Sequence, residues 1–159
     1  MLKQSGRLNA IIDDLLSLSH IEEESSEGEI VKEEGPLCMV LDSAVQTCQL
    51  KADEQNVKIS LECADNLQVP MNATLIEQAI VNLLVNAIKY TENSGEVSVK
   101  ARRVQQNEKN QVIIEVKDTG IGIAKEHLPR LFERFYRSDK ARSRELGGTG
   151  LGLAIVKHI

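Results

Sequence analysis

The chain has 159 residues, of which 42% are hydrophobic and 27% charged, and this composition is typical of a globular protein that buries a core. Its net charge of -5 and its aromatic content of 3%, without Trp, argue against a basic nucleic-acid surface and against stacking on unpaired bases. No apolar run approaches the ~20 residues that span a bilayer, and the first residues do not resemble a secretory signal. We therefore expect no nucleic-acid partner and no membrane span within this sequence.

The first predicted element is an amphipathic helix from about Leu2 to Ile21. A single helix cannot bury an apolar stripe by itself, so it must pack on its own domain, on a partner helix or on a second copy. These alternatives stay open at this point. The stripe recurs every three or four residues and comprises Leu8, Ile11, Ile12, Leu15 and Leu16.

An acidic segment with seven glutamates lies between Glu22 and Glu34. Its composition predicts a solvated linker over Glu22–Glu27 and a short strand near Glu29–Glu33. The expected organisation is a helix over residues 1–24, a linker and first strand over 25–36, and a globular domain over 37–159.

The globular part mixes helices and strands, with an apparent hairpin, and this order favours the α+β class over a regular βαβ repeat. Asn72 is the expected N-cap of an apolar helix. The predicted elements, in chain order, are a helix over Leu37–Glu54, a strand over Val57–Leu61, a helix over Ala73–Tyr90, strands over Glu96–Val104 and Gln111–Lys117 joined by a turn over Gln105–Asn110, and a last helix from about Thr149.

The cysteines, Cys38, Cys48 and Cys63, are odd in number and form no C-x-x-C pair. Such a pattern predicts reduced thiols rather than a disulfide framework or a zinc site. A reducing compartment, the cytoplasm, is therefore the expected location.

Polar residues interrupt the apolar helix over Ala73–Tyr90. Asn82 and Asn86 are four residues apart, so they share one face, and Lys89 follows on that side. The asparagines could bond to a neighbouring loop. Alternatively, an amide oxygen could bind Mg²⁺ while the lysine contacts a phosphate.

Two glycine-rich segments provide further candidates. Asp118 precedes Gly120 and Gly122 directly after a strand, either as a capped turn or as an acceptor for an amino group beside closely approaching backbone. The second segment, Gly148 to Gly152, leads into the last helix, where backbone N–H groups could bind an anion. Neither the P-loop nor the dinucleotide-binding pattern fits it.

Between these segments, Phe132 and Phe135 are three residues apart and are expected to anchor a lid on the core. Arg137 is placed to reach a phosphate. The charged stretch Lys140–Glu145 is expected to be mobile.

Together these motifs resemble the ATP-binding domain of two-component sensor histidine kinases, from about Leu37 to Ile159. Four separated motifs occur in the family's order: VNLLVNAIKYT, DTGIGI, LFERFYR and GGTGLGLAIVKHI. The resemblance implies a two-layer α/β sandwich, as in gyrase and chaperone ATPases, preceded here by a long amphipathic helix.

The resemblance also implies the role of each site residue in binding ATP with Mg²⁺. Asn86 would coordinate the Mg²⁺ that bridges the phosphates, Asn82 would lie beside it, and Asp118 would bind the adenine amine. Lys89 would contact phosphate and Arg137 would approach the γ-phosphate, so these two and Asn82 are the expected catalytic residues. The remaining nucleotide contacts would be Tyr90, Gly120, Gly122, Gly148, Thr149, Gly150, Leu151 and Gly152.

The implied reaction is transfer of the ATP γ-phosphoryl group to a histidine and then to an aspartate of a response regulator. The N-terminal helix is similar to the second helix of the family's dimerisation and phosphotransfer domain. The first helix of that domain, which carries the phosphoacceptor histidine, and the family's final strands have no counterpart in this sequence. We therefore expect nucleotide binding without autophosphorylation, self-association through the N-terminal helix, and a parent protein whose membrane anchoring stays open.

Two alternatives remain. An ATPase clamp or serine-kinase-type regulator would keep the fold, but these relatives carry Glu one turn before the Mg²⁺-binding Asn, and Asn82 cannot serve as a general base. The other alternative is an interaction module without a nucleotide site.

Overall fold

The computed structural model describes residues 2–28, 30–64, 67–106, 109–138 and 148–159. The chain forms two compact units, which we call the sheet unit (Val31–Gly122) and the helical unit (Met1–Ile30 with Ile123–Ile159). Each unit is described by itself.

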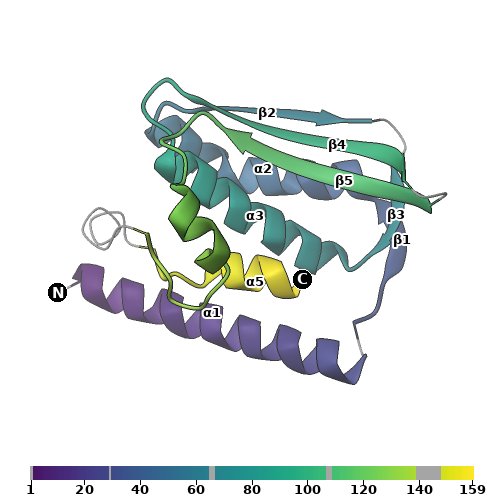
Figure 1. Cartoon of the computed structure of the whole chain (residues 1–159), viewed down its shortest axis with the longest axis horizontal. Helices are drawn as coiled ribbons and strands as arrows, with labels where there is room; N and C mark the ends of the chain where they lie inside the picture. The colour runs from purple at the N-terminus through teal and green to yellow at the C-terminus, as the bar shows by residue number, and fades with distance from the viewer. Residues whose placement is uncertain (1, 29, 65–66, 107–108, 139–147) are drawn as a thin grey trace. The chain divides into compact units, whose positions relative to one another are not determined.

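The sheet unit contains one three-stranded and one two-stranded sheet (Figure 1). In the larger sheet the order is β2-β4-β5, with β2 parallel to β4 and β4 antiparallel to β5. In the smaller sheet β1 pairs antiparallel with β3. The strands are β1 (Glu33–Pro36), β2 (Lys58–Cys63), β3 (Gln68–Met71), β4 (Glu96–Gln106) and β5 (Lys109–Asp118).

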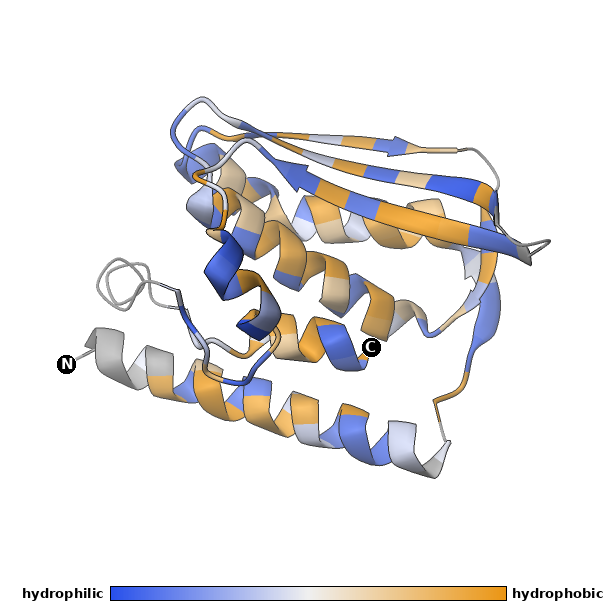
Figure 2. Cartoon of the chain, in the orientation of Figure 1, coloured by the Kyte–Doolittle hydropathy of each residue, from blue (hydrophilic) through white to orange (hydrophobic). Residues whose placement is uncertain are grey.

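Helices α2 (Leu37–Glu54) and α3 (Ala73–Tyr90) lie together on one face of the larger sheet (Figure 1). Strand residues alternate between this covered face and solvent, as Figure 2 shows by the alternating hydropathy along β4 and β5. The core between the layers includes Leu41, Leu84 and Val99, each fully buried. These layers confirm the predicted α+β sandwich.

Two sequence signals set the ends of elements in this unit. The Asn72 side chain accepts a hydrogen bond of 3.1 Å from the Leu75 N–H, so the predicted N-cap of α3 is confirmed. The predicted hairpin is also confirmed, although pairing continues to Gln106 and Lys109 within the expected turn. Backbone pairing therefore extends beyond the apolar alternation that located the strands.

In the helical unit, α1 (Leu2–Glu27) contacts α5 (Gly152–His158), and η1 (Lys125–Arg130) is a short 3-10 helix. The apolar residues nearest the end of α1, Leu18 and Ile21, are buried. Most of the predicted stripe is exposed: Leu8, Ile12, Leu15 and Leu16. Within the described parts of the chain, no helix is both long enough and apolar enough to cross a membrane.

The prediction of a solvated linker over Glu22–Glu27 is wrong, because these residues continue α1. Glutamate is a good helix former, and the helix ends only before Gly28, whose φ of 71° is typical of a residue that ends a helix. The first strand, β1, accordingly starts at Glu33 rather than near Glu29.

The prediction of three reduced thiols is also wrong. Cys38 and Cys63 form a disulfide with a Cα–Cα distance of 5.7 Å, while Cys48 is free and buried. Cys38 lies at the start of α2 and Cys63 at the end of β2, so only the packing of the helix on the sheet brings them together.

Candidate functional site

The polar face of α3 is opposite its buried face. Leu84 and Ile88 are buried in the core, whereas Asn82, Asn86 and Lys89 are only half-buried. At 3.6 residues per turn the three polar residues project from the side away from the core. The side chains predicted to share a face therefore lie on the surface of the sheet unit.

The side-chain amide nitrogen of Asn82 lacks a hydrogen-bond partner among the described residues. This Nδ2 atom is buried. A buried donor left in this state costs roughly 1–3 kcal/mol. An amide held at this cost fits a position that meets a polar ligand.

The end of α3 meets the first glycine segment. The Ile121 N–H donates to the Tyr90 carbonyl oxygen at 3.3 Å, and the Gly120 N–H donates to Asp118 Oδ1 at 2.9 Å. A Cβ atom on Gly120 would overlap the Tyr90 carbonyl and lie 2.8 Å from Asp118 Oδ1. The fold thus brings Asp118 and the asparagine helix together, and only glycine fits between them.

Asp118 is exposed at the end of β5. A carboxylate has capacity for several hydrogen bonds, so the bond from Gly120 leaves room for an amino group of a ligand. Thr119, to which sequence reasoning gave no role, fixes this turn because its Oγ1 accepts from the Glu96 N–H at 2.9 Å. A hydroxyl residue directly after the strand-end aspartate is the signal that could have identified it.

Positive charge and an aromatic ring lie at the end of α3. The Lys89 Nζ is 5.3 Å from the centroid of the Tyr90 ring, within the range of a cation–π interaction. Gly122, farther along the turn, has a φ of 70° and open space at its Cβ position. The positive φ that the glycine pattern predicted for this segment is therefore present at Gly122.

In the helical unit the second glycine segment is bonded to the phenylalanine segment. The Phe135 N–H donates to the Gly150 carbonyl oxygen at 2.9 Å, and a Cβ on Gly150 would lie 3.0 Å from Phe135 Cα. The Leu151 N–H donates to Thr149 Oγ1 at 3.2 Å. Gly148 and Gly152 flank these residues, and Gly152 begins α5. This contact between the two segments was not predicted.

The prediction that Phe132 and Phe135 anchor on the core is wrong, because their side chains are 45% and 53% exposed. Residues 131–135 form turns rather than a helix, so a spacing of three does not place both rings on one face. Phe135 also has a φ of 61°, the left-handed region. The predicted mobile stretch Lys140–Glu145 lies outside the described residues.

A second cluster that sequence reasoning missed lies just before Arg137. His127 Nδ1 and the Tyr136 hydroxyl are 2.8 Å apart, and the Arg130 guanidinium lies 4.3 Å from the Tyr136 ring centroid. Hydrogen bonds from Arg130 to Glu133, the shortest of them 2.9 Å, lower the pKa of that carboxyl. These contacts fix the conformation of the segment that leads to Arg137, which is half-buried.

The predicted site residues are therefore divided between the two units. The sheet unit carries Asn82, Asn86, Lys89, Tyr90, Asp118, Gly120 and Gly122, and the helical unit carries Arg137, Gly148, Thr149, Gly150, Leu151 and Gly152. No group of three His, Cys, Asp or Glu side chains able to hold a metal is found in the described ranges. A neutral amide oxygen such as that of Asn86 suits Mg²⁺ that is also held by substrate phosphates.

Comparison with protein families identifies the class. Residues 71–159 match the family described as histidine kinase-, DNA gyrase B-, and HSP90-like ATPase. The chain belongs to this ATPase family.

Comparison with individual proteins specifies the branch of the family. The whole chain is 38% identical to the phosphate regulon sensor protein PhoR of Pseudomonas aeruginosa and 37% identical to the sensor-like histidine kinase SenX3 of Mycobacterium tuberculosis. It covers 34% and 37% of those proteins, so it spans about a third of the length of these curated relatives. The chain carries the ATP-binding catalytic domain of a sensor histidine kinase.

Solved structures of histidine kinases resemble this chain in fold. Full-length ShkA in complex with AMPPNP superposes with a TM-score of 0.78 at 26% identity, over 98% of this chain and 31% of ShkA. The Acinetobacter baumannii histidine kinase AdeS gives a TM-score of 0.74 at 26% identity, over 99% of this chain and 68% of AdeS. These comparisons confirm the fold and the family that the motifs indicated.

Proposed function

We propose that this chain binds ATP together with Mg²⁺ and forms the catalytic part of a protein-histidine kinase. The observation that carries the proposal is the junction of Tyr90, Asp118 and Gly120, where the end of the asparagine helix meets a glycine turn with no room for a side chain. The AMPPNP complex of ShkA, a structural relative, supports nucleotide as the ligand.

Each group in the sheet unit has a defined part in this proposal. Asp118 accepts a hydrogen bond from the adenine amine, and Tyr90 lies against the nucleotide. The Asn86 amide oxygen holds Mg²⁺ beside Asn82, and Lys89 contacts a phosphate. Bound Mg²⁺ supplies charge neutralisation for the phosphates.

The helical unit carries the other residues that the family motifs assign to the nucleotide. Glycines and Thr149 allow the backbone of Gly148–Gly152 to approach phosphate oxygens closely. Arg137 supplies positive charge to the γ-phosphate as its bond to the leaving oxygen breaks. Because phosphoryl transfer depends mainly on positioning and charge, this set of groups suits transfer of the γ-phosphoryl group to a histidine.

The partner reaction and the assembly are also part of the proposal. The phosphoryl group would pass from the histidine to an aspartate of a response regulator, as in two-component signalling. The parent would self-associate through α1, whose exposed Leu8 and Leu16 support an intermolecular contact. Because ATP is the proposed substrate, the proposed location of this part of the protein is the cytoplasm.

The ATPase-clamp alternative is less well supported. The position one turn before Asn86 holds Asn82, and an amide cannot accept a proton from water as a general base. Of the relatives named above, PhoR is a sensor protein and SenX3 a sensor-like histidine kinase. Steady ATP hydrolysis by this chain that is lost in Asn82→Ala would instead favour the clamp.

Calorimetric titration with a non-hydrolysable ATP analogue and Mg²⁺ tests the binding site. We expect Asn86→Ala and Asp118→Ala each to weaken binding about tenfold or more, since a hydrogen bond to a charged group is worth roughly 1.5–3 kcal/mol. Matched controls are Asn110→Ala and Asp13→Ala, which remove exposed residues of the same types outside the site. Unchanged affinity in a folded Asn86→Ala or Asp118→Ala variant would contradict the proposal.

A further inference from the structure

The sheet unit contains a cysteine pair that the proposed nucleotide chemistry does not use. Cys38 is the second residue of α2 and Cys63 the last residue of β2. Their Cα–Cα distance of 5.7 Å lies in the usual range for a disulfide, so the bond forms without displacement of the backbone. Neither residue is fully buried, in contrast to Cys48.

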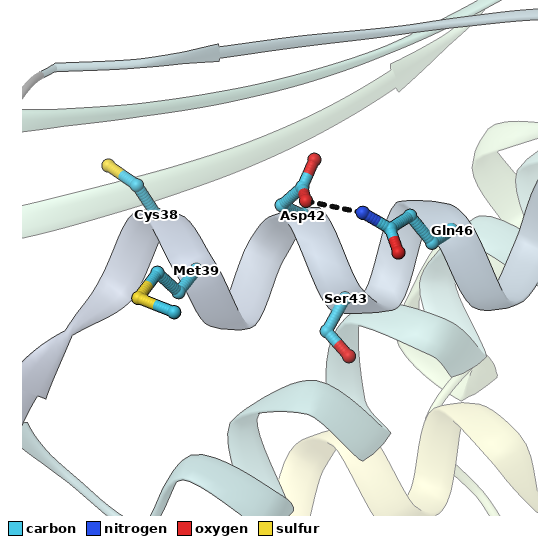
Figure 3. Close-up of a pocket in the computed structure, with 5 residues that line it drawn as sticks. All are labelled: Cys38, Met39, Asp42, Ser43 and Gln46. Atoms are coloured by element: carbon cyan, nitrogen blue, oxygen red, sulfur yellow. Dashed lines mark hydrogen bonds between the residues drawn. The ribbon is translucent and has the colours of Figure 1, made fainter.

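The disulfide is accessible from one side of α2. Cys38 lines a surface hollow of about 400 Å³ together with Met39, Asp42, Ser43 and Gln46. Figure 3 shows Cys38 and Met39 projecting to different sides at the start of the helix, with the polar residues following along it. A volume in this range accommodates a small molecule. A low-molecular-weight thiol can therefore approach the Cys38 sulfur.

The fold also supports the reduced state. The Ala64 carbonyl oxygen lies 3.2 Å from Cys38 Sγ and 3.9 Å from Cys63 Sγ. When the disulfide is reduced, the Cys38 thiol can donate to this oxygen without a change in backbone position. Both oxidation states are thus compatible with the same local geometry, and this compatibility is what a reversible site requires.

We propose that Cys38 and Cys63 form a reversible redox-modification site that exchanges with low-molecular-weight disulfides of the oxidised-glutathione class. A Cys38 thiolate attacks one sulfur of the small disulfide and releases one thiol. The Cys63 thiolate then attacks the Cys38 sulfur and releases the second thiol. Two electrons pass from the cysteine sulfurs to the small disulfide, and the two cysteine protons end on the two released thiols.

The modification site is separate from the proposed adenine contact. Cys63 pairs with Ala101, which pairs with Ile114 on β5, whereas Asp118 lies four residues farther along that strand. Four residues of a strand correspond to about 13 Å. Oxidation is therefore expected to change the stability of the sheet unit without a comparable change in nucleotide affinity.

The proposal is tested on the whole chain by incubation in buffers with different ratios of reduced to oxidised glutathione. Exchange is then quenched, free thiols are labelled with maleimide, and the products are measured by mass spectrometry. We expect Cys38 and Cys63 to lose labelling together in oxidised glutathione, and the chain to lose two hydrogens in mass. Both should regain labelling in millimolar reduced glutathione. Because the disulfide lowers the conformational entropy of the unfolded chain, the melting temperature of the oxidised form should be about 5–10 °C higher.

Cys48 is the internal control, since burial raises the pKa of its thiol and keeps it unreactive until the chain unfolds. In Cys63→Ser, which lacks the thiol that resolves the intermediate, we expect Cys38 to accumulate as a mixed disulfide with glutathione. Two results would overturn the proposal: labelling of both cysteines that persists in oxidised glutathione, or a disulfide that millimolar reduced glutathione does not reduce in the folded chain. Neither result depends on nucleotide binding.

Discussion

At the scale of single residues, close contacts at the candidate site exclude larger side chains. Gly120 lies between the Tyr90 carbonyl and the Asp118 carboxylate, and Thr119 fixes the adjacent backbone through Glu96. The turn therefore holds Asp118 in one position relative to the end of α3. Pre-organised groups of this kind lose little entropy when a ligand binds.

Gly120→Ala is expected to destabilise the chain by roughly 1–3 kcal/mol and to weaken nucleotide binding, because the added methyl group overlaps backbone that cannot move freely. Denaturant unfolding and calorimetry measure the two effects. Gly6→Ala is the matched control, since nothing lies within 4 Å of its Cβ position in α1, and alanine favours a helix by up to about 1 kcal/mol. If the two variants had the same free energy of unfolding and the same nucleotide affinity, the expectation of a steric overlap at Gly120 would be contradicted.

At the scale of elements, α1 combines a buried end with an exposed apolar stripe. Ile21 is 2% exposed, whereas Leu8 and Leu16 are 59% and 57% exposed. The same helix end carries Glu22, which forms ion pairs with Arg134 and with His158, the latter at 3.1 Å. The helix is thus fixed within its own unit at one end and left open to a partner along the other.

Leu16→Glu is expected to prevent self-association of the chain, because a charge in the centre of an apolar interface is costly to desolvate. Sedimentation velocity over a range of concentrations measures the change. Met39→Glu, which alters a residue 70% exposed on α2, should leave self-association unchanged. A wild-type chain that stays monomeric at every concentration would contradict this expectation.

At the scale of the whole molecule, stability comes from burial between the sheet and its two helices. Leu84 is completely buried in the core, whereas Leu50 is 70% exposed. The same residue type therefore occurs in both environments, and their comparison isolates the contribution of burial.

Leu84→Ala is expected to lower the free energy of unfolding by about 2–5 kcal/mol, through lost transfer energy and the cavity left behind. Leu50→Ala should change it by no more than about 0.5 kcal/mol. Urea unfolding followed by circular dichroism measures both values. A similar loss in the two variants would mean that the sheet–helix core does not dominate stability.

Local patterns along the chain were sufficient to predict several elements of the fold. Apolar periodicity located α2, α3 and the hairpin, and Asn72 marked a helix start, because these features depend on near neighbours in the chain. The family motifs indicated the ATP-binding domain. The positions of Asn82 and Asn86 on one face followed from helix geometry alone.

The contacts between distant segments could not be predicted in this way and became known from the folded chain. Three such contacts are the Cys38–Cys63 disulfide, the close approach of the Tyr90 carbonyl to Gly120, and the hydrogen bond from Phe135 to Gly150. Each joins residues that are well separated in the sequence. The left-handed backbone conformation of Phe135 is likewise not apparent from the spacing of the two phenylalanines. Such contacts follow from the packing of elements in three dimensions, and the periodicity of apolar residues along the chain does not predict them.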